Sequence, residues 1–204
     1  MILSICIPTY NRINQLDNCL NSILISKKNV DNFNFEICIS DNCSEEDPES
    51  IIKKYNKELT IKYNRNEKNF GFAINGIKTI SMAEGEFSWM IGNDDLILPE
   101  TLTKLKSLLN SNLDKDYFFI NSYHLESSYL DKFPSPFNTK NLNFKNMKKI
   151  SSLKTNKEGY FWDVIDPKVS WEFLIGIYLN LFKTKKWLKS TDIIDQEKIK
   201  DTRV

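Results

Sequence analysis

Short apolar runs alternate with polar stretches along the first half of the chain. The runs are residues 2–7 (ILSICI), 35–40 (FEICIS), 59–63 (LTIKY) and 87–91 (FSWMI). Continuous runs of this length are typical of strands that are buried on both faces of a parallel sheet. Each run is followed by a polar segment and then by apolar residues at helical spacing. This repeated strand-then-helix order predicts an α/β fold with a Rossmann-like, mainly parallel sheet flanked by helices.

The same pattern indicates where the helices begin and end. Ser44 and Asp47 have the spacing of a capping box, and Pro48 falls in the first turn of the helix that follows. Gly85 is expected to end a later helix. The expected helices cover residues 13–24, a segment from 48 onward, 71–83 and 101–109, and a fifth strand covers residues 117–121.

The strand-helix alternation stops after residue 121. Residues 131–160 are rich in Asn, Lys, Ser and Phe, carry Pro134 and Pro136, and are too long for an ordinary connection. We therefore expect a poorly packed excursion there. The chain divides into a regular α/β half, residues 1–121, and a less regular region of the same domain, residues 122–204.

Composition and charge narrow the class of function. The 204 residues carry a formal net charge of +1, so no overall field favours nucleic acid as a partner. No window has the apolar length of a membrane span, and the N-terminus lacks the features of a signal peptide. The four cysteines form no CxxC pair, and Cys6 and Cys38 lie in apolar runs as small hydrophobes. A reducing, cytoplasmic setting is therefore expected, and the single His124 is assigned a structural or surface role.

The candidate chemistry is concentrated in the turn Gly92-Asn93-Asp94-Asp95, which ends the fourth apolar run. Two adjacent carboxylates at the end of a buried strand are costly unless a cation balances them. A hard divalent cation takes oxygen ligands and can bridge to a diphosphate, so the turn suggests a metal site. Taken alone, the pair is better explained as a polar turn with two solvated aspartates than as a metal site. The other segments of the chain are what shift the interpretation toward a metal site.

Polar loops follow the other predicted strands as well. In an open parallel sheet these loops gather at one edge, where ligands bind. The edge would join residues 8–12 (PTYNR), Asp41-Asn42, residues 65–71 (RNEKNFG) and the acidic turn. Their groups could stack a base, accept its ring N–H and hold a metal-bound diphosphate. Each loop alone has an ordinary structural explanation, and their coincidence in order is what favours a nucleotide site.

Four segments in order, ICIPTYNR, ICISDNCSEED, RNEKNFGFAINGI and AEGEFSWMIGNDDLILPE, resemble the nucleotide-diphospho-sugar glycosyltransferases of family 2, which have the GT-A fold. The resemblance covers about residues 1–110 and is weak from Ile120 onward. It implies a nucleotide-sugar-binding half, residues 1–121, and an acceptor-side region, residues 122–204. It also implies transfer of a sugar from a nucleotide-diphosphate donor to an acceptor hydroxyl with inversion, with Mn²⁺ or Mg²⁺ as cofactor.

The resemblance assigns roles to individual residues. Asp41 matches the acid that recognises the base or ribose, and Asp94, with its acidic neighbour Asp95, matches the metal-binding end of the DxD motif. The chain departs from the family pattern at Asn42, where a second acid is common, and at Gly92, where the first acid of DxD falls. The implied donor-binding residues are Pro8, Thr9, Tyr10, Asn11, Arg12, Asp41, Arg65, Asn69, Gly71 and Asn93.

The general base is expected well downstream of the acidic turn, where it would take the proton of the acceptor hydroxyl. Asp201 has about the right spacing, with Asp192 and Asp195 as alternatives. The family normally continues past the position of Val204, so a second interpretation is a truncated chain whose base lies beyond this end.

The product class and the partners follow from the resemblance alone. It implies bacterial surface polysaccharide or glycan biosynthesis, with a glycan or lipid-linked glycan acceptor, in the cytoplasm or peripherally at the inner face of the membrane. A catalytically inactive nucleotide-sugar-binding module is one alternative, favoured by Asn42 and Gly92. A nucleotidyltransferase is another, although PTYNR has none of the glycines that its phosphate loop usually carries. A dinucleotide-binding or flavodoxin-like protein is disfavoured, because no GxGxxG follows the first strand.

Overall fold

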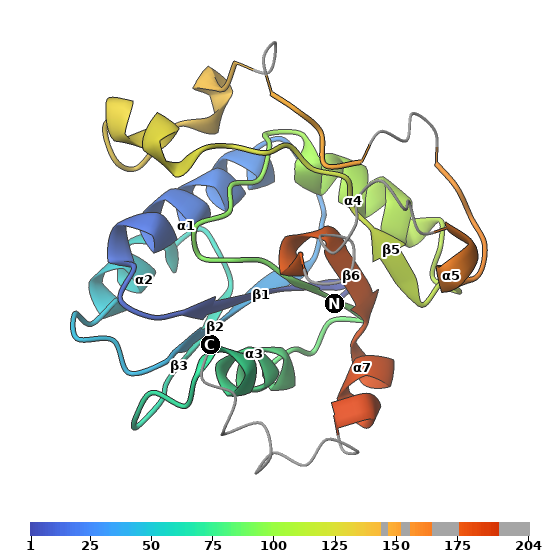
Figure 1. Cartoon of the computed structure of the whole chain (residues 1–204), viewed down its shortest axis with the longest axis horizontal. Coiled ribbons are helices and arrows are strands. Elements are labelled where there is room, and N and C mark those ends of the chain that lie inside the picture. The colour runs from blue at the N-terminus through green and yellow to red at the C-terminus, as the bar shows by residue number, and fades with distance from the viewer. Residues whose placement is uncertain (144–146, 152–155, 165–175, 192–204) are drawn as a thin grey trace.

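A six-stranded sheet in the order β3-β2-β1-β4-β6-β5 forms the centre of the molecule (Figure 1). The computed structural model describes residues 1–143, 147–151, 156–164 and 176–191. β6 (Asn180–Lys183) runs antiparallel between β4 and β5 (Tyr117–Phe119). The remaining strands are parallel to one another: β1 (Leu3–Thr9), β2 (Phe35–Asp41), β3 (Ile61–Arg65) and β4 (Phe87–Met90). The predicted α/β fold with a mainly parallel sheet is confirmed.

Helices cover both faces of this sheet (Figure 1). One face is covered by α1 (Ile13–Lys27), α2 (Glu49–Tyr55) and α4 (Thr101–Asn110), and the other by α3 (Phe72–Ser81) and α7 (Thr184–Thr191). Short helices occupy the less regular part of the chain: η1 (Ser127–Lys132), η2 (Thr139–Asn141), α5 (Phe161–Val164) and η4 (Ile177–Leu179).

The two faces of the sheet differ in chemistry. Ile5 and Ile7 of β1 pack with Leu16 and Leu20 of α1 in the main hydrophobic core, and all four are fully buried. Each such side chain contributes about 1.5–3 kcal/mol relative to leaving it exposed. The face toward α3 holds only a small apolar cluster around Cys6 and its register partner Cys38, confirming that these cysteines behave as small hydrophobes. Most of the other buried side chains described on this face are polar, including Ser4, Glu36, Ser40, Asn75 and Ser88, while Ile74 of α3 is apolar.

Pro8 and Thr9 were expected in the loop after the first strand but belong to β1. The backbone of Cys6 faces β4, since its carbonyl accepts from Ile91 N. Backbone groups along a strand alternate between its two neighbours, so the backbone of Pro8 points to the same side as that of Cys6. At that point β4 has already ended, so the missing N–H of Pro8 costs no hydrogen bond of the sheet. The strand therefore continues to the pair Thr9–Asp41 along β2.

Two further local predictions were wrong. Ser44 does not cap α2: its N–H donates to the Asp41 carboxylate, and the first turn of the helix is bonded by Asp47 Oδ1 instead, at 2.9 Å from Glu49 N. Gly85 does not end α3, which stops at Ser81. A Cβ at Gly85 would lie 2.7 Å from the backbone of Leu3 and Ser4, so the glycine allows close approach to β1.

The later part of the chain is more integrated than its composition suggests. β6 was not predicted, and the fifth strand ends at Phe119 rather than at residue 121. Residues 131–160 were expected to pack poorly, yet Phe137, Thr139 and Leu142 are buried. The segment 133–142 crosses α1 (Figure 1), where Asn18 Oδ1 accepts from Phe137 N at 2.7 Å and Asn21 Nδ2 donates to Phe137 O at 2.9 Å. The expectation of a loose excursion is wrong for this segment.

Candidate functional site

The loops after β1 and β2 are bonded to each other at the carboxyl edge of the sheet. Asn11 has a left-handed backbone, with φ of 50°, and this directs its N–H to Ser44 Oγ at 2.8 Å. Its side-chain oxygen accepts from Glu45 N at 2.8 Å. The neighbouring Tyr10 side chain stays exposed. The two loops therefore form one unit with an aromatic ring at its surface.

Asp41 lies beneath this unit and is fully buried. Its carboxylate accepts from the N–H and the hydroxyl of Ser44 and lies 3.6 Å from Arg65 Nε. Arg65 also pairs with Asp47 at 2.8 Å and donates to Ser44 O at 2.6 Å. Both residues thus hold the second loop in place, and a direct contact between Asp41 and a base would require Ser44 to move.

The loop after β3 is held by side-chain amides. Asn42 Nδ2 donates to Asn69 Oδ1 at 2.7 Å, and its Oδ1 accepts from Phe70 N at 3.0 Å. Asn69 Oδ1 also accepts from Gly71 N at 2.8 Å, just before α3. Beneath them, Asn66 Nδ2 donates to Asn75 Oδ1 at 2.9 Å. Asn42 therefore occupies a place that needs both a donor and an acceptor.

The acidic turn is fixed by its first two residues. Asn93 is buried and donates to Thr9 Oγ1 at 2.8 Å, which joins the ends of β4 and β1. Gly92 N donates to Asp95 Oδ2 at 2.6 Å. Burial raises the pKa of Asp95 to about 7, and the neighbouring Asp94 charge adds to the rise, while the bond from Gly92 opposes it. Asp95 thus ionises near neutral pH.

Asp94 is the exposed member of the pair. Its Oδ2 lies 2.7 Å from Arg12 Nη1, an ion pair between residues 82 apart in the chain. This contact brings the first loop to the acidic turn, so all four predicted loops meet at one edge. The structure therefore brings together Thr9, Asn11, Arg12, Asp41, Arg65, Asn69, Gly71, Asn93, Asp94 and Asp95, with Pro8 and Tyr10 adjoining them in the chain.

The two carboxylates converge above Gly92. A Cβ at this glycine would lie 2.6 Å from Asp94 Oδ1 and 3.1 Å from Asp95 Oδ2. Gly92 therefore leaves open the place where two carboxylate oxygens meet, and such a donor set suits a hard divalent cation whose other ligands are water and phosphate. Within the described residues, no three His, Cys, Asp or Glu side chains gather closely enough to hold a metal by themselves.

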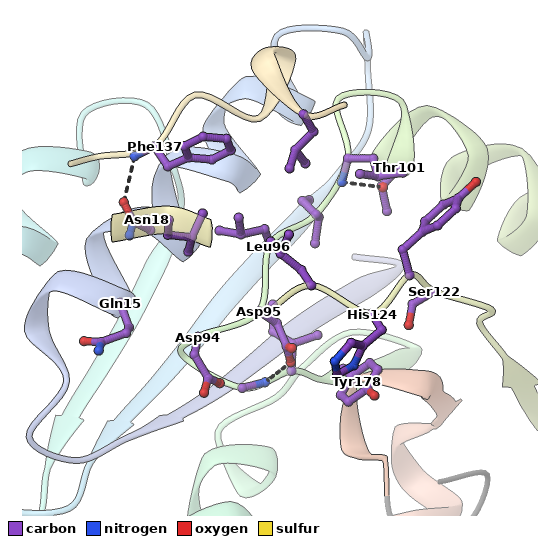
Figure 2. A pocket seen from close by; sticks show the side chains of 18 of the residues that line it. Gln15, Asn18, Asp94, Asp95, Leu96, Thr101, Ser122, His124, Phe137 and Tyr178 are labelled. Atoms are coloured by element: carbon purple, nitrogen blue, oxygen red, sulfur yellow. Dashed lines mark hydrogen bonds between the residues drawn. The ribbon is translucent and has the colours of Figure 1, made fainter. Parts of the chain in front are cut away.

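A large pocket of about 920 Å³ opens beside the acidic turn (Figure 2). One end of the pocket is lined by Asp94, Asp95, His124 and Tyr178. The other end is lined by Asn18 and Phe137. Its walls are mainly apolar and include Trp89, Leu96, Leu130, Phe133 and Leu142. A ligand that reaches the acidic turn through this pocket would contact both carboxylates and aromatic surface.

Several residues that line this pocket were not predicted from the sequence. Gln15 and Asn18 lie on α1 one to two turns after Arg12, and that helical spacing was the available signal. His124 was expected to be a surface residue, and it is indeed exposed, with Nε2 at 3.1 Å from Glu126 Oε1. It also lines the pocket. The proposed bases Asp192, Asp195 and Asp201 lie outside the described residues.

The order and spacing of these loops agree with a known family. The family model described as glycosyl transferase family 2 matches residues 4–163. This chain belongs to that family. The match extends beyond residue 110, so the family pattern continues further into the later region than the sequence resemblance indicated.

Relatives of this family 2 member include bacterial glycosyltransferases. Abequosyltransferase RfbV from Salmonella typhimurium is 40% identical over 116 residues, which are 56% of this chain and 34% of that protein. Poly(ribitol-phosphate) beta-N-acetylglucosaminyltransferase TarS from Staphylococcus aureus is 30% identical over 113 residues, 55% of this chain and 19% of that protein. The chain thus matches about a third or less of the length of these relatives.

Solved structures show the same fold. Residues 1–349 of S. aureus TarS in complex with UDP superpose with a TM-score of 0.63 at 22% identity, covering 99% of this chain and 52% of that one. The same fragment in complex with UDP-GlcNAc gives a TM-score of 0.52 at 29% identity, covering 59% and 34%. The family 2 chain therefore has the GT-A fold, as the resemblance implied.

Proposed function

We propose that this chain is the catalytic GT-A domain, or part of it, of a glycosyltransferase that moves a sugar from a nucleotide-diphosphate donor to an acceptor hydroxyl. The observation that carries the proposal is the joining of four loops into one polar edge by Asn11–Ser44, Asn42–Asn69, Thr9–Asn93 and Arg12–Asp94. Such an edge suits a ligand with a base, a diphosphate and a sugar in sequence. Membership of family 2 supports the same reaction class.

The donor half is residues 1–121. Exposed Tyr10 offers a ring to the base, and Arg12 offers a guanidinium suited to phosphate oxygens. The small pocket of about 220 Å³ between Thr9, Arg12, Ser44 and Pro48 is the nearest recess for the nucleoside. The TarS structures in complex with UDP and UDP-GlcNAc support a nucleotide sugar as donor, without fixing the base or the sugar here.

Asp94 and Asp95 are the residues that would hold Mn²⁺ or Mg²⁺, through the oxygens that converge above Gly92. A bound cation would offset negative charge on the diphosphate leaving group. The buried amide of Asn93 and the bond from Gly92 N to Asp95 hold this turn in position. An inverting displacement further needs a carboxylate that takes the acceptor proton, and Asp201, Asp192 and Asp195 remain the proposed candidates.

The acceptor side is the 920 Å³ pocket, because it begins at the same two carboxylates. Its mixed apolar and polar walls suit a glycan or lipid-linked glycan, and the activities of abequosyltransferase RfbV and TarS support bacterial surface polysaccharide biosynthesis. A cytoplasmic enzyme that associates peripherally with the inner face of the membrane would fit such an acceptor. In the described part of the chain, none of the helices is both long and apolar enough to cross a bilayer.

A two-stage experiment tests this proposal. Thermal-shift screening of UDP, GDP, CDP and ADP with and without Mn²⁺ identifies the nucleotide, because a ligand of the folded state raises stability by mass action. Product release is then assayed with the matching sugar nucleotides, in this chain and in a form as long as its relatives. Release of nucleoside diphosphate is expected. Binding without turnover in the longer form would favour an inactive binding module, and release of pyrophosphate from a nucleoside triphosphate would favour a nucleotidyltransferase.

A further inference from the structure

Arg12 and Asp94 are each other's ion-pair partners at the donor edge. The pair spans 2.7 Å, and the side chains are 54% and 55% exposed. Neither has a second ion-pair partner among the residues that the structure describes. Arg65, the other arginine of this edge, differs in this respect, since it is bonded to Asp41, Asp47 and Ser44. Arg12 is therefore the guanidinium that can leave its place without opening a loop.

The same two side chains are also the ones that the donor and the cation need. A guanidinium binds phosphate oxygens in a bidentate manner, and Arg12 lies in the loop that faces the donor. Asp94 offers one of the two oxygens that converge above Gly92. Arg12 holds Asp94 Oδ2, whereas the oxygen above Gly92 is Asp94 Oδ1. A divalent cation and the guanidinium would therefore share one carboxylate through its two oxygens, and their like charges repel each other at this short distance. The ion pair therefore opposes both ligands when each binds alone.

We propose that Arg12 is a positioning residue that occupies Asp94 until a diphosphate draws the guanidinium away, so that donor and divalent cation bind with positive coupling. The inference rests on the proposed function and adds the residue that links the two ligands. Once the diphosphate holds Arg12, Asp94 is released to the cation without further cost. The effect must be reciprocal, so the cation that displaces Arg12 makes it available to the diphosphate.

The test is Mn²⁺ affinity, measured from free Mn²⁺ by electron paramagnetic resonance for the parent chain and for Arg12→Gln. An exposed ion pair is worth about 0.2–1 kcal/mol, so Arg12→Gln is expected to bind Mn²⁺ alone about 1.4- to 5-fold more tightly. This gain should disappear when the best nucleoside diphosphate of the thermal-shift screen is present. A loss of folding or a merely structural role would lower Mn²⁺ affinity, not raise it.

Two controls separate this inference from its alternatives. Lys53→Gln removes one exposed cation that pairs only locally with Glu49, and it should leave Mn²⁺ affinity unchanged. Asp94→Asn should abolish Mn²⁺ binding in both backgrounds. Arg12→Lys retains the charge and should behave like the parent toward Mn²⁺ alone.

The outcomes are distinct. If Asp94→Asn weakens Mn²⁺ binding but Arg12→Gln does not strengthen it, the inference is wrong and the metal site stands. If Arg12→Gln strengthens Mn²⁺ binding equally with and without the diphosphate, Arg12 acts only through its long-range positive charge. This result would also overturn the proposed coupling. If neither variant changes Mn²⁺ binding, the metal assignment in the proposed function falls together with the inference.

Discussion

The side-chain amide of Asn42 donates to Asn69 Oδ1 at 2.7 Å, which joins the loop after β2 to the segment before α3. The same amide donates to Gly71 O at 3.3 Å, and its oxygen accepts from Phe70 N and Asn66 Nδ2. Only a side chain with both a donor and an acceptor can make these bonds. The family's common acid at this position would not serve here, so Asn42 does not by itself indicate lost activity.

Asn42→Asp tests this arrangement with nearly the same shape. A carboxylate would face two oxygens, Asn69 Oδ1 and Gly71 O, without a proton to donate. We expect a loss of about 1–3 kcal/mol in the free energy of unfolding by urea denaturation at pH 7. Asn34→Asp, at an exposed position, should change it by less than about 0.5 kcal/mol. Equal effects of the two changes would mean that the amide network contributes little.

Gly92→Ala tests the place where the carboxylates converge. The new methyl group would lie 2.6 Å from Asp94 Oδ1, so this exposed side chain must turn away. We expect unfolding free energy to change by less than about 1 kcal/mol, because the backbone at Gly92 is compatible with alanine. Mn²⁺ affinity measured with a bound nucleoside diphosphate should fall. Gly76→Ala, whose new methyl group would meet the Met90 side chain at ordinary distances of 3.5 Å from Sδ and 3.9 Å from Cε, should leave that affinity unaltered. Tight Mn²⁺ binding by Gly92→Ala would argue against the site.

Glu36 gives the fold a defined pH dependence. It is fully buried, with Lys62 Nζ at 2.8 Å and bonds from Ser4 Oγ and Glu84 N at 2.7 Å each. Burial alone would raise the pKa of Glu36, but the bonds from Lys62, Glu84 and Ser4 outweigh it and hold the pKa below its ordinary value. The stabilisation is therefore fully present above the unfolded pKa of about 4.3 and is lost as pH falls through the lower folded pKa.

Glu36→Gln should consequently cost about 1–3 kcal/mol of unfolding free energy at pH 7, and the difference from the parent should shrink below about pH 4. Urea denaturation at pH 7, 4 and 3 measures both values. Glu84→Gln is the matched control, because Glu84 also pairs with Lys62 but is 71% exposed. A difference that stays constant with pH would show that ionised Glu36 is not the stabilising form.

Asn18→Ala should loosen the segment that covers α1. Asn18 Oδ1 is the acceptor for Phe137 N and for Ser135 Oγ, so its loss removes both bonds. We expect chymotrypsin to cleave at Phe133 or Phe137 about five- to thirtyfold faster, as the local opening free energy falls by about 1–2 kcal/mol. The control variant Gln15→Ala, on the same helix, should be cleaved by chymotrypsin at the same rate as the parent. If the first cuts fall elsewhere in both variants, the segment is held by its aromatic packing rather than by Asn18.

β1, β2 and β4 were predictable because their residues are almost all buried and form continuous, mainly apolar runs. β3 lies at the sheet edge with no fully buried residue, and its position was predicted from the short run before it rather than from burial. β6 was not predicted, because Asn180-Leu181-Phe182-Lys183 has polar ends and only Leu181 is fully buried. The predicted capping box at Ser44 was wrong for a different reason. Ser44 has the right spacing from Asp47, but Asp41 at the end of β2 competes for its N–H.

Sequence order also predicted which loops meet at the donor edge, since parallel strands place them there. It did not predict the bonds between them. Arg12 and Asp94 are 82 residues apart, and no local pattern specifies that pairing. The burial of Phe137 depends on Asn18 and Asn21 of α1, more than a hundred residues earlier, so composition alone suggested a loose segment.

The antiparallel position of β6 has a consequence for synthesis on the ribosome. β4 ends at Met90 and its neighbour on that side begins at Asn180, about 90 residues later. At ~5–20 residues per second, the nascent chain carries an unpaired β4 edge for roughly 5–20 s. Such an edge can recruit strands from other chains. Translation speed between these two strands is therefore a determinant of how much of this protein reaches its native state.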